Sequence, residues 1–346
     1  MGRVILVAGV SRYLGGRFAR ILTADPAVSR VIGVDVVPPP HDIGDADFVR
    51  ADIRNPVIAK VIAQANVDTV VHMNVIATPT SAGGRVSMKE INVIGTMQLL
   101  AACQKAPSVR RLVVKSTAGV YGSSARDPAM FTEDTGPKVL PRSGWAKDSV
   151  EVEGYVRGFS RRRPDVDVVT LRLANFIGPG VRTALTDYFS LSIIPTVLGF
   201  DARLQFVHED DGLEALRLAT VGSATGTINV AGDGVILLSQ AARIAGRPAL
   251  GIPPMATRFV GQLFRRSGLV DFTPEQMRFL SFGRAIDTSR MRLILGLHPT
   301  YTTREAFVDF VRGRHLTGPL SADAVERLEA GALALLRRLE PVGRSS

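Results

Sequence analysis

The 346-residue sequence contains a single cysteine, Cys103. One cysteine excludes an intrachain disulfide and a multi-cysteine metal site, and it is typical of a protein from the reducing cytoplasm. No apolar run is long enough for a membrane span, and Pro195 interrupts the best candidate, Tyr188 to Phe200. The first residues match neither a secretory signal nor a myristoylation pattern. We therefore predict a cytoplasmic protein with no membrane span and no metal site.

Lysine is also scarce, because only six of the 42 basic residues are Lys and the rest are Arg. The net charge of +10 raises the question of nucleic-acid binding, but the basic residues are scattered among acids. Short clusters such as Arg161 to Arg163 lie near predicted helix ends, where cations are favoured. This distribution favours a solvated basic surface and predicts no nucleic-acid partner.

The first 35 residues form the most informative stretch. Val4 to Ala8 is an apolar run of strand length that breaks at Gly9, and Gly15 opens a helical segment. A second apolar run then ends at Asp35. This order of strand, glycine turn, helix, strand and acid is typical of a dinucleotide-binding unit. Glycines allow the backbone to approach the pyrophosphate, and Asp35 would bind the ribose hydroxyls, which favours NAD over NADP.

One glycine of this loop is absent. A Gly-x-x-Gly-x-x-Gly spacing would place glycines at 9, 12 and 15, but Arg12 occupies the middle position. The guanidinium either reinforces pyrophosphate binding through a charged hydrogen bond or partly blocks the site. The loop residues expected to hold the cofactor are Gly9, Ser11, Arg12, Tyr13, Leu14 and Gly15.

Beyond Asp35, predicted strands at 46–49, 68–72, 110–115 and 166–173 alternate with predicted helices at 55–65, 86–106 and 145–159. This alternation predicts an α/β fold with a Rossmann-like, doubly wound parallel sheet. Ligands bind such sheets beyond the carboxyl ends of the strands, so Asp35, Asp52, His72 and Thr117 should line one crevice.

The regular alternation weakens after about residue 183. Short strands are expected at 204–208 and 226–230, and helices at 287–295, 303–312 and 321–339. We predict an NAD-binding domain over residues 1–180, completed by sheet segments near 204–230. A smaller α/β substrate domain at 181–315 and a helical tail at 316–346 would follow.

Several spaced motifs between residues 3 and 310 resemble the extended short-chain dehydrogenase/reductase family. They are Ala51 to Arg54, Val70 to His72, Ser116 to Gly122, Leu171 to Asn175, Gln205 to Asp211 and Asn229 to Gly232. This family comprises NAD-dependent epimerases and dehydratases of nucleotide sugars, and the sequence is most similar to actinobacterial UDP-glucose 4-epimerase-like members.

The resemblance implies a role for several residues. Asp52 would bind the adenine amino group, Ile53 would pack on the adenine ring, and Thr117 would be the catalytic hydroxyl. Asn175 would contact substrate phosphates, and Arg203 joins it by position and charge. His72 and Asn92 complete the expected cofactor set. The family also implies a homodimer formed through helices near 86–106 and 145–157.

The family's Tyr-x-x-x-Lys pair is incomplete. In the family, the tyrosine exchanges the substrate's hydroxyl proton, its pKa lowered by the lysine, which also holds the nicotinamide ribose. None of the five tyrosines here has a lysine four residues later. Lys147 matches the lysine, but Ser143 stands where the tyrosine belongs, and a serine hydroxyl is a poor base. A 4,6-dehydratase is disfavoured because Ala118 and Gly119 replace the family's acids.

Three hypotheses follow. The first, which we favour, is an atypical UDP-sugar epimerase with a relocated acid or base, for which Tyr121, His72 and Lys115 are candidates. The second is a protein that binds NAD and a nucleotide sugar without turnover. The third is an oxidoreductase of lipid or sterol alcohols, in which the apolar stretch Pro253 to Phe264 lines the pocket instead of forming an ordinary core helix.

Overall fold

The computed structural model describes residues 2–73, 83–256 and 274–316. Its centre is a seven-stranded sheet in the order β3-β2-β1-β4-β5-β6-β11, and every neighbouring pair is parallel. The strands are β1 (Arg3–Ala8), β2 (Val28–Asp35), β3 (Asp47–Arg50), β4 (Thr69–His72), β5 (Arg111–Thr117), β6 (Asp167–Leu173) and β11 (Gly226–Val230). The predicted Rossmann-like sheet is thus confirmed.

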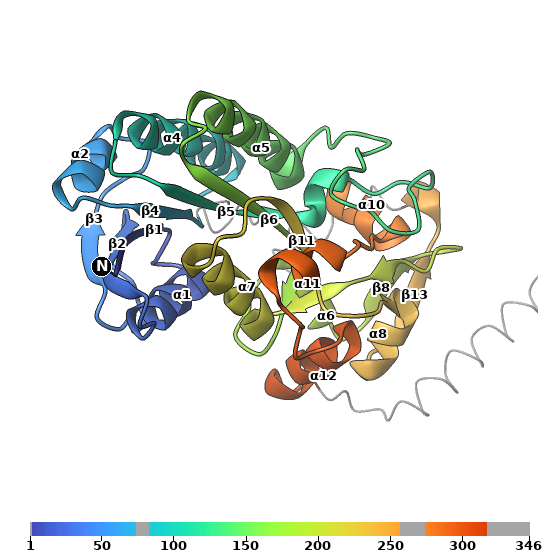
Figure 1. The fold of residues 1–346 in the computed structure, drawn as a ribbon. Coiled ribbons are helices and arrows are strands. Elements are labelled where there is room, and N and C mark those ends of the chain that lie inside the picture. The colour runs from blue at the N-terminus through green and yellow to red at the C-terminus, as the bar shows by residue number, and fades with distance from the viewer. Residues whose placement is uncertain (1, 74–82, 257–273, 317–346) are drawn as a thin grey trace, which may run out of the picture.

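Helices cover both faces of this sheet (Figure 1). Helices α1 (Tyr13–Thr23) and α7 (Glu209–Val221) lie on one face, and α2 (Val57–Gln64), α4 (Thr96–Lys105) and α5 (Gly144–Arg162) lie on the other. Successive side chains of a strand point to opposite faces. In β5, Val113 therefore joins the core under α1 and α7, whereas Leu112 and Val114 join the core under α2, α4 and α5.

The long helix expected at 86–106 is present but contains a π-helical turn. It consists of α3 (Arg85–Lys89), the π segment η2 (Glu90–Gly95) and α4. The Thr96 hydroxyl donates a 2.5 Å hydrogen bond to the carbonyl of Asn92. Gly95 lies against Ile53, since a Cβ at residue 95 would sit 2.7 Å from the Ile53 Cδ1 atom. A π-helical turn contains one residue more than an α-helical turn. The sequence pattern predicted a helix here but did not indicate this π-helical turn.

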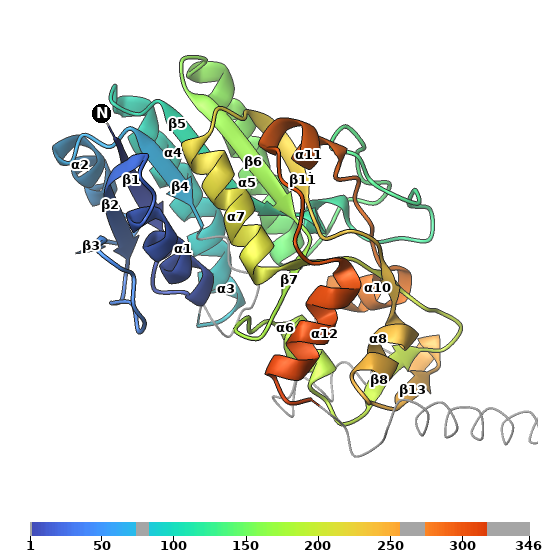
Figure 2. The same ribbon diagram turned by 60° about the horizontal axis from the view of Figure 1, so that its bottom comes forward.

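A smaller domain lies beside the sheet, on the side away from β3 (Figures 1 and 2). It contains β8 (Ile194–Val197) paired with β13 (Ala249–Ile252), and β9 (Arg203–Leu204) paired with β12 (Ile236–Leu237). Its helices are α6 (Ala184–Phe189), α8 (Leu238–Ile244), α10 (Pro274–Phe282) and α12 (Thr303–Gly313), with a 3₁₀ turn η4 (Pro254–Ala256). Phe189, Phe206 and Phe307 pack together in its core.

The chain returns to the large domain more than once. Strand β11 joins the main sheet beside β6, and α11 (Ser289–Leu295) packs on β11. The segment near Gln205 was also expected to complete the main sheet, but it does not. Strand β10 (Phe206–His208) pairs with β7 (Asn175–Ile177) in a separate two-stranded ladder. The predicted helix at 321–339 lies outside the described residues. Within the described ranges, the structure contains no helix with the length and apolar character needed to cross a bilayer.

Arg111 is a buried cation that joins β5 to the end of α7. It is 2% exposed, and its guanidinium donates to the carbonyls of Ala219 and Ala224 and to the carboxylate of Asp167. We expect Arg111→Met to lower the free energy of unfolding by about 2–4 kcal/mol, because the two buried carbonyls lose their partners.

Urea denaturation measures this effect, and the neighbouring Arg110 provides the control. The Arg110 side chain is 67% exposed and only 3.6 Å from Asp165, so Arg110→Met should cost less than about 0.5 kcal/mol. Equal losses for the two variants would contradict a structural role for the buried arginine.

Candidate active site

The loop between β1 and α1 has the backbone geometry that its glycines predict. Gly9 has a φ of 102°, and a Cβ at Gly15 would lie 2.0 Å from the Gly9 carbonyl oxygen, so a larger residue does not fit there. The Ser11 N–H donates to Asp35 Oδ2 at 3.0 Å, and the Val36 N–H donates to Oδ1 at 2.8 Å. Asp35 therefore anchors the loop, while its two oxygens retain lone pairs for other donors.

A cavity of about 220 Å³ opens beside this loop, at the carboxyl ends of β1 and β5. Seven of the residues predicted from the sequence line it, namely Gly9, Arg12, Tyr13, Leu14, Gly15, Thr117 and Asn175. Lys115, a sequence candidate for the relocated acid or base, lines it too, and the structure adds others, including Met73, Trp145, Phe176 and Arg182. The cavity lies where a doubly wound sheet binds its ligands.

The charge of this cavity is positive. Arg12, Lys115 and Arg182 line it, and its described lining contains no Asp or Glu. Burial lowers the pKa of Arg12, and the nearby charge of Asp35 partly offsets this. Burial, with a smaller contribution from Arg12, lowers the pKa of Lys115 to about 8. Such a cavity suits an anion, and the glycine turn with these cations fits the diphosphate of a dinucleotide.

Besides Ser11, Asp35 and Lys147, four residues expected around the cofactor lie outside the cavity's described lining. Asp52 accepts hydrogen bonds from Arg54, the closest at 2.6 Å, and these lower the pKa of Asp52. Ile53 is buried against Gly95. Their roles at the adenine end of the cofactor stay predictions.

The other two are His72 and Asn92, whose side chains contact residues of helices α4 and α5. His72 Nε2 lies 2.7 Å from the Thr96 hydroxyl, and burial followed by the charge of Lys115 lowers the His72 pKa to about 4. The Asn92 amide donates to Asp148 in α5 at 3.3 Å. Both side chains are buried, so each has a structural explanation.

The segment that matches Tyr-x-x-x-Lys forms the start of α5. Ser143 is the exposed N-cap residue of this helix, and Lys147 Nζ lies 3.8 Å from Glu151 with the lysine side chain 45% exposed. Neither residue is in the described lining of the cavity. Trp145 faces the cavity instead, and it packs on Gly119, where a Cβ would lie 2.5 Å from the indole.

Tyr121 belongs to a buried network on the other side of the loop. Its hydroxyl donates to Asn229 Oδ1 and accepts from Arg172, each at 2.8 Å, and its ring stacks on Phe131. Burial, the largest influence, raises its pKa. A hydroxyl that is bonded on both sides and has a raised pKa favours a structural role over that of a relocated base.

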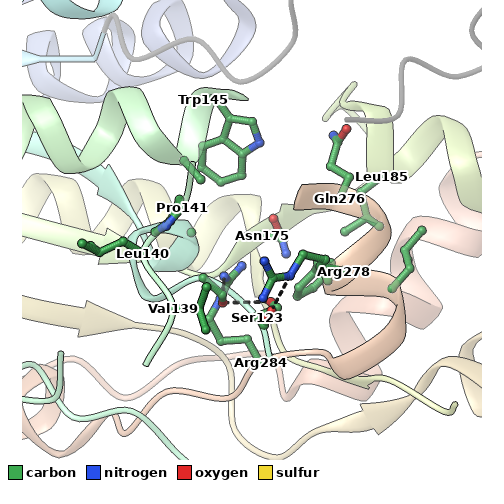
Figure 3. A pocket seen from close by; sticks show the side chains of 15 residues that line it. Ser123, Val139, Leu140, Pro141, Trp145, Asn175, Leu185, Gln276, Arg278 and Arg284 are labelled. Atoms are coloured by element: carbon green, nitrogen blue, oxygen red, sulfur yellow. Dashed lines mark hydrogen bonds between the residues drawn. The ribbon is translucent and has the colours of Figure 1, made fainter. Parts of the chain in front are cut away.

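A second cavity, of about 60 Å³, lies between the large domain and α10 (Figure 3). It shares Trp145, Asn175, Leu185 and Gln276 with the first cavity. Two arginines line it (Figure 3): Arg278 Nε donates to the Ser123 carbonyl at 3.1 Å, and Arg284 Nη1 donates to the Gly122 carbonyl at 2.6 Å. Burial lowers the pKa of Arg284 to about 10.

The sequence predicted Arg203 as a residue that contacts substrate phosphates, and it did not predict Arg278 or Arg284. Arg203 donates to the Ala129 carbonyl at 3.0 Å and is in neither described lining. A bridge between β9 and Gly283 brings Arg284 to the cavity, with the Arg284 N–H donating to the Arg203 carbonyl. Gly283, with a φ of 67°, was the available signal, but a single glycine does not indicate a contact between segments so far apart in sequence.

Comparison with known proteins identifies the class. Residues 5–231 match the model of the NAD dependent epimerase/dehydratase family. The chain belongs to this family, as the motifs predicted, and NAD is the family's cofactor.

Individual relatives span most of the chain. An uncharacterised protein of Mycobacterium tuberculosis is 48% identical over 340 residues, covering 97% of this chain and 90% of the relative. The UDP-glucose 4-epimerase of Mycolicibacterium smegmatis is 26% identical, covering 89% and 98% of the two chains. The crystal structure of UDP-glucose 4-epimerase from Thermotoga maritima with UDP-glucose has a TM-score of 0.69 at 18% identity, covering 91% of this chain and 99% of that one.

The buried position of Tyr121 leads to a prediction. Tyr121→Phe should lower the free energy of unfolding by about 1–2 kcal/mol, because Asn229 and Arg172 each lose a buried partner. NAD affinity should not change, and both quantities can be measured on the same preparation by urea denaturation and cofactor titration. Loss of the redox reaction in a variant of unchanged stability would instead make Tyr121 a base.

Proposed function

We propose that the protein is an NAD-dependent oxidoreductase of a nucleotide sugar, with an epimerase-like reaction on a UDP-sugar. One observation carries the proposal: the cationic cavity beside the glycine loop adjoins a second cavity that contains two arginines. Four residues line both cavities, so a dinucleotide in the first and a sugar diphosphate in the second would meet near Trp145 and Asn175. The family and the UDP-sugar epimerases among the similar proteins support it.

Each part of the site has a task in this proposal. The loop from Gly9 to Gly15 and the Arg12 guanidinium would hold the diphosphate of NAD, which supplies a hydride acceptor. The Thr117 oxygen accepts from the Gly119 N–H at 3.0 Å, so its hydroxyl proton is available for the reacting oxygen of the sugar. Arg278 and Arg284 suit the substrate's diphosphate because guanidinium groups bind phosphate with two donors.

A second function, binding of NAD and a nucleotide sugar without turnover, has a specific observation in its favour. Ser143 and Lys147 both lie outside the described lining of the cofactor cavity, so the family's usual proton-transfer pair does not assemble there. The third hypothesis, on lipid alcohols, depended on Pro253 to Phe264, and residues 257–264 of that stretch lie outside the described residues.

We also propose a homodimer in the cytoplasm. The helices expected to form the dimer pack side by side as α4 and α5 (Figure 1). They and the turns that precede α4 expose large apolar side chains at Val86, Ile94, Met97 and Tyr155. Exposed apolar groups on adjacent helices suit a self-complementary interface.

Trp145, the only tryptophan in the chain, gives a direct test because it lines both cavities. Titration with NAD and with UDP should each change its fluorescence. Arg278→Met should raise the Kd for UDP by about tenfold or more, because it removes a charged hydrogen bond to the ligand. The Kd for NAD should stay unchanged. Arg203→Met should change neither.

The reaction is tested by incubating the protein with NAD and UDP-galactose and separating the sugar nucleotides by chromatography. Formation of UDP-glucose is expected. Tight binding of both ligands with no product would favour the binding protein, and no fluorescence response to NAD would contradict the proposed function altogether.

A further inference from the structure

Lys115 lies on β5, two residues before Thr117. Residues two apart on a strand share a face, and both residues line the cofactor cavity. The hydroxyl of the intervening Ser116 is engaged elsewhere, since it donates to Glu153 in α5 at 2.6 Å. Lys115 is therefore positioned beside the hydroxyl that would bind the reacting oxygen of the substrate.

The amine of Lys115 has no protein counter-ion among the described residues. Among the described residues, no ion pair or hydrogen bond joins its Nζ to another side chain, and the amine lies 5.9 Å from the centroid of the Phe176 ring. The charged or titratable groups around it are Arg12 and Tyr13 at the start of α1, Arg182 at the cavity edge and His72 on β4. None of them is a carboxylate, so this environment disfavours the ammonium form.

We propose that Lys115 is the proton acceptor of the reaction, in place of the tyrosine that Ser143 replaces. This inference depends on the proposed function. As the substrate's secondary alcohol becomes a carbonyl, its O–H bond breaks and the proton passes to the lone pair of Lys115 Nζ. The hydride on the same carbon goes to the oxidised nicotinamide dinucleotide, and reduction of the carbonyl reverses both transfers.

The other candidates are less well placed. Tyr121 is bonded to Asn229 and Arg172, and His72 is buried with its Nε2 on Thr96. Ser143 lies on the exposed start of α5. Lys115 is the titratable group that combines a place in the cavity, proximity to Thr117 and a pKa lowered to about 8. A half-buried lysine with a pKa near the working pH is a suitable general base.

The first test measures the protonation of the Lys115 amine and requires no turnover. The protein is labelled with a trace of acetic anhydride over a pH series, and each lysine-containing peptide is quantified by mass spectrometry. Labelling of Lys115 should rise with a midpoint near pH 8, well below the ordinary value of about 10.4 for a lysine, and the peptide of the exposed Lys60 is the reference. Saturating NAD should protect Lys115 and leave Lys60 unchanged. A midpoint for Lys115 equal to that of Lys60 would overturn the proposal.

The second test separates proton transfer from anion binding. Lys115→Arg keeps a positive charge but cannot deprotonate, and Lys115→Met keeps the bulk of the side chain without the charge. We expect Lys115→Arg to bind NAD within about threefold of the unaltered protein, while reduction of bound nicotinamide by the UDP-sugar falls by about 10²-fold or more in both variants. The rate in the unaltered protein should rise with pH through about 8, because the neutral amine is the active form. Lys60→Met is the matched control, and circular dichroism checks folding.

The outcomes distinguish this inference from the proposed function. If the unaltered protein reduces nicotinamide and Lys115→Arg does so at the same rate, Lys115 only binds an anion and the inference is wrong. A large gain of activity in Ser143→Tyr would also overturn it, because the missing phenol would then limit the reaction. If the unaltered protein binds NAD but reduces none with any UDP-sugar, the proposed turnover fails and the assignment of Lys115 falls with it.

Discussion

The positive charge of the cofactor cavity is the constraint on which the site depends. Arg12 and Lys115 both line this space, whose described lining contains no carboxylate, and like charges gathered in one partly buried space disfavour each other's charged form. The parallel sheet creates this situation because it brings the carboxyl ends of β1 and β5 to one edge. An anionic ligand in the cavity would neutralise this positive charge. In the proposed function, the Arg12 guanidinium would supply the diphosphate of NAD with a donor at the position of the loop's missing middle glycine.

Much of the large domain could be predicted from the sequence. The sequence pattern placed β3, α2 and α11 within about two residues of their observed positions, and it did the same for α12 of the smaller domain. The loop from Gly9 to Gly15 was also accessible, since steric contact with the Gly9 carbonyl requires glycine at 15. The π turn at 90–95 was not, because it arises from the packing of Gly95 on Ile53 and not from a local preference.

The parts of the site that sequence reasoning missed are those made by contacts distant in sequence. Arg284 reaches the second cavity through a bridge to β9, and no local motif encodes that pairing. Tyr121 follows Thr117 closely, but the short helix η3 (Ala118–Tyr121) turns its side chain toward Arg172 and Asn229. Sequence proximity was therefore a poor guide to which hydroxyl faces the cavity. Lys115 was recognisable as a candidate, but only the three-dimensional arrangement shows that no described carboxylate pairs with it.

Gly119 and Trp145, from the two segments expected to carry the catalytic groups, contact each other. A side chain at residue 119 would collide with the Trp145 indole, so the tryptophan requires glycine there. Gly119 offers no side chain that could transfer a proton, and the Trp145 indole lines both cavities. Ser143 meanwhile lies outside, at the exposed N-cap of α5. In the proposed function, Trp145 therefore forms the wall of the pocket while the Ser143 hydroxyl stays outside, and Lys115 would accept the proton in its place.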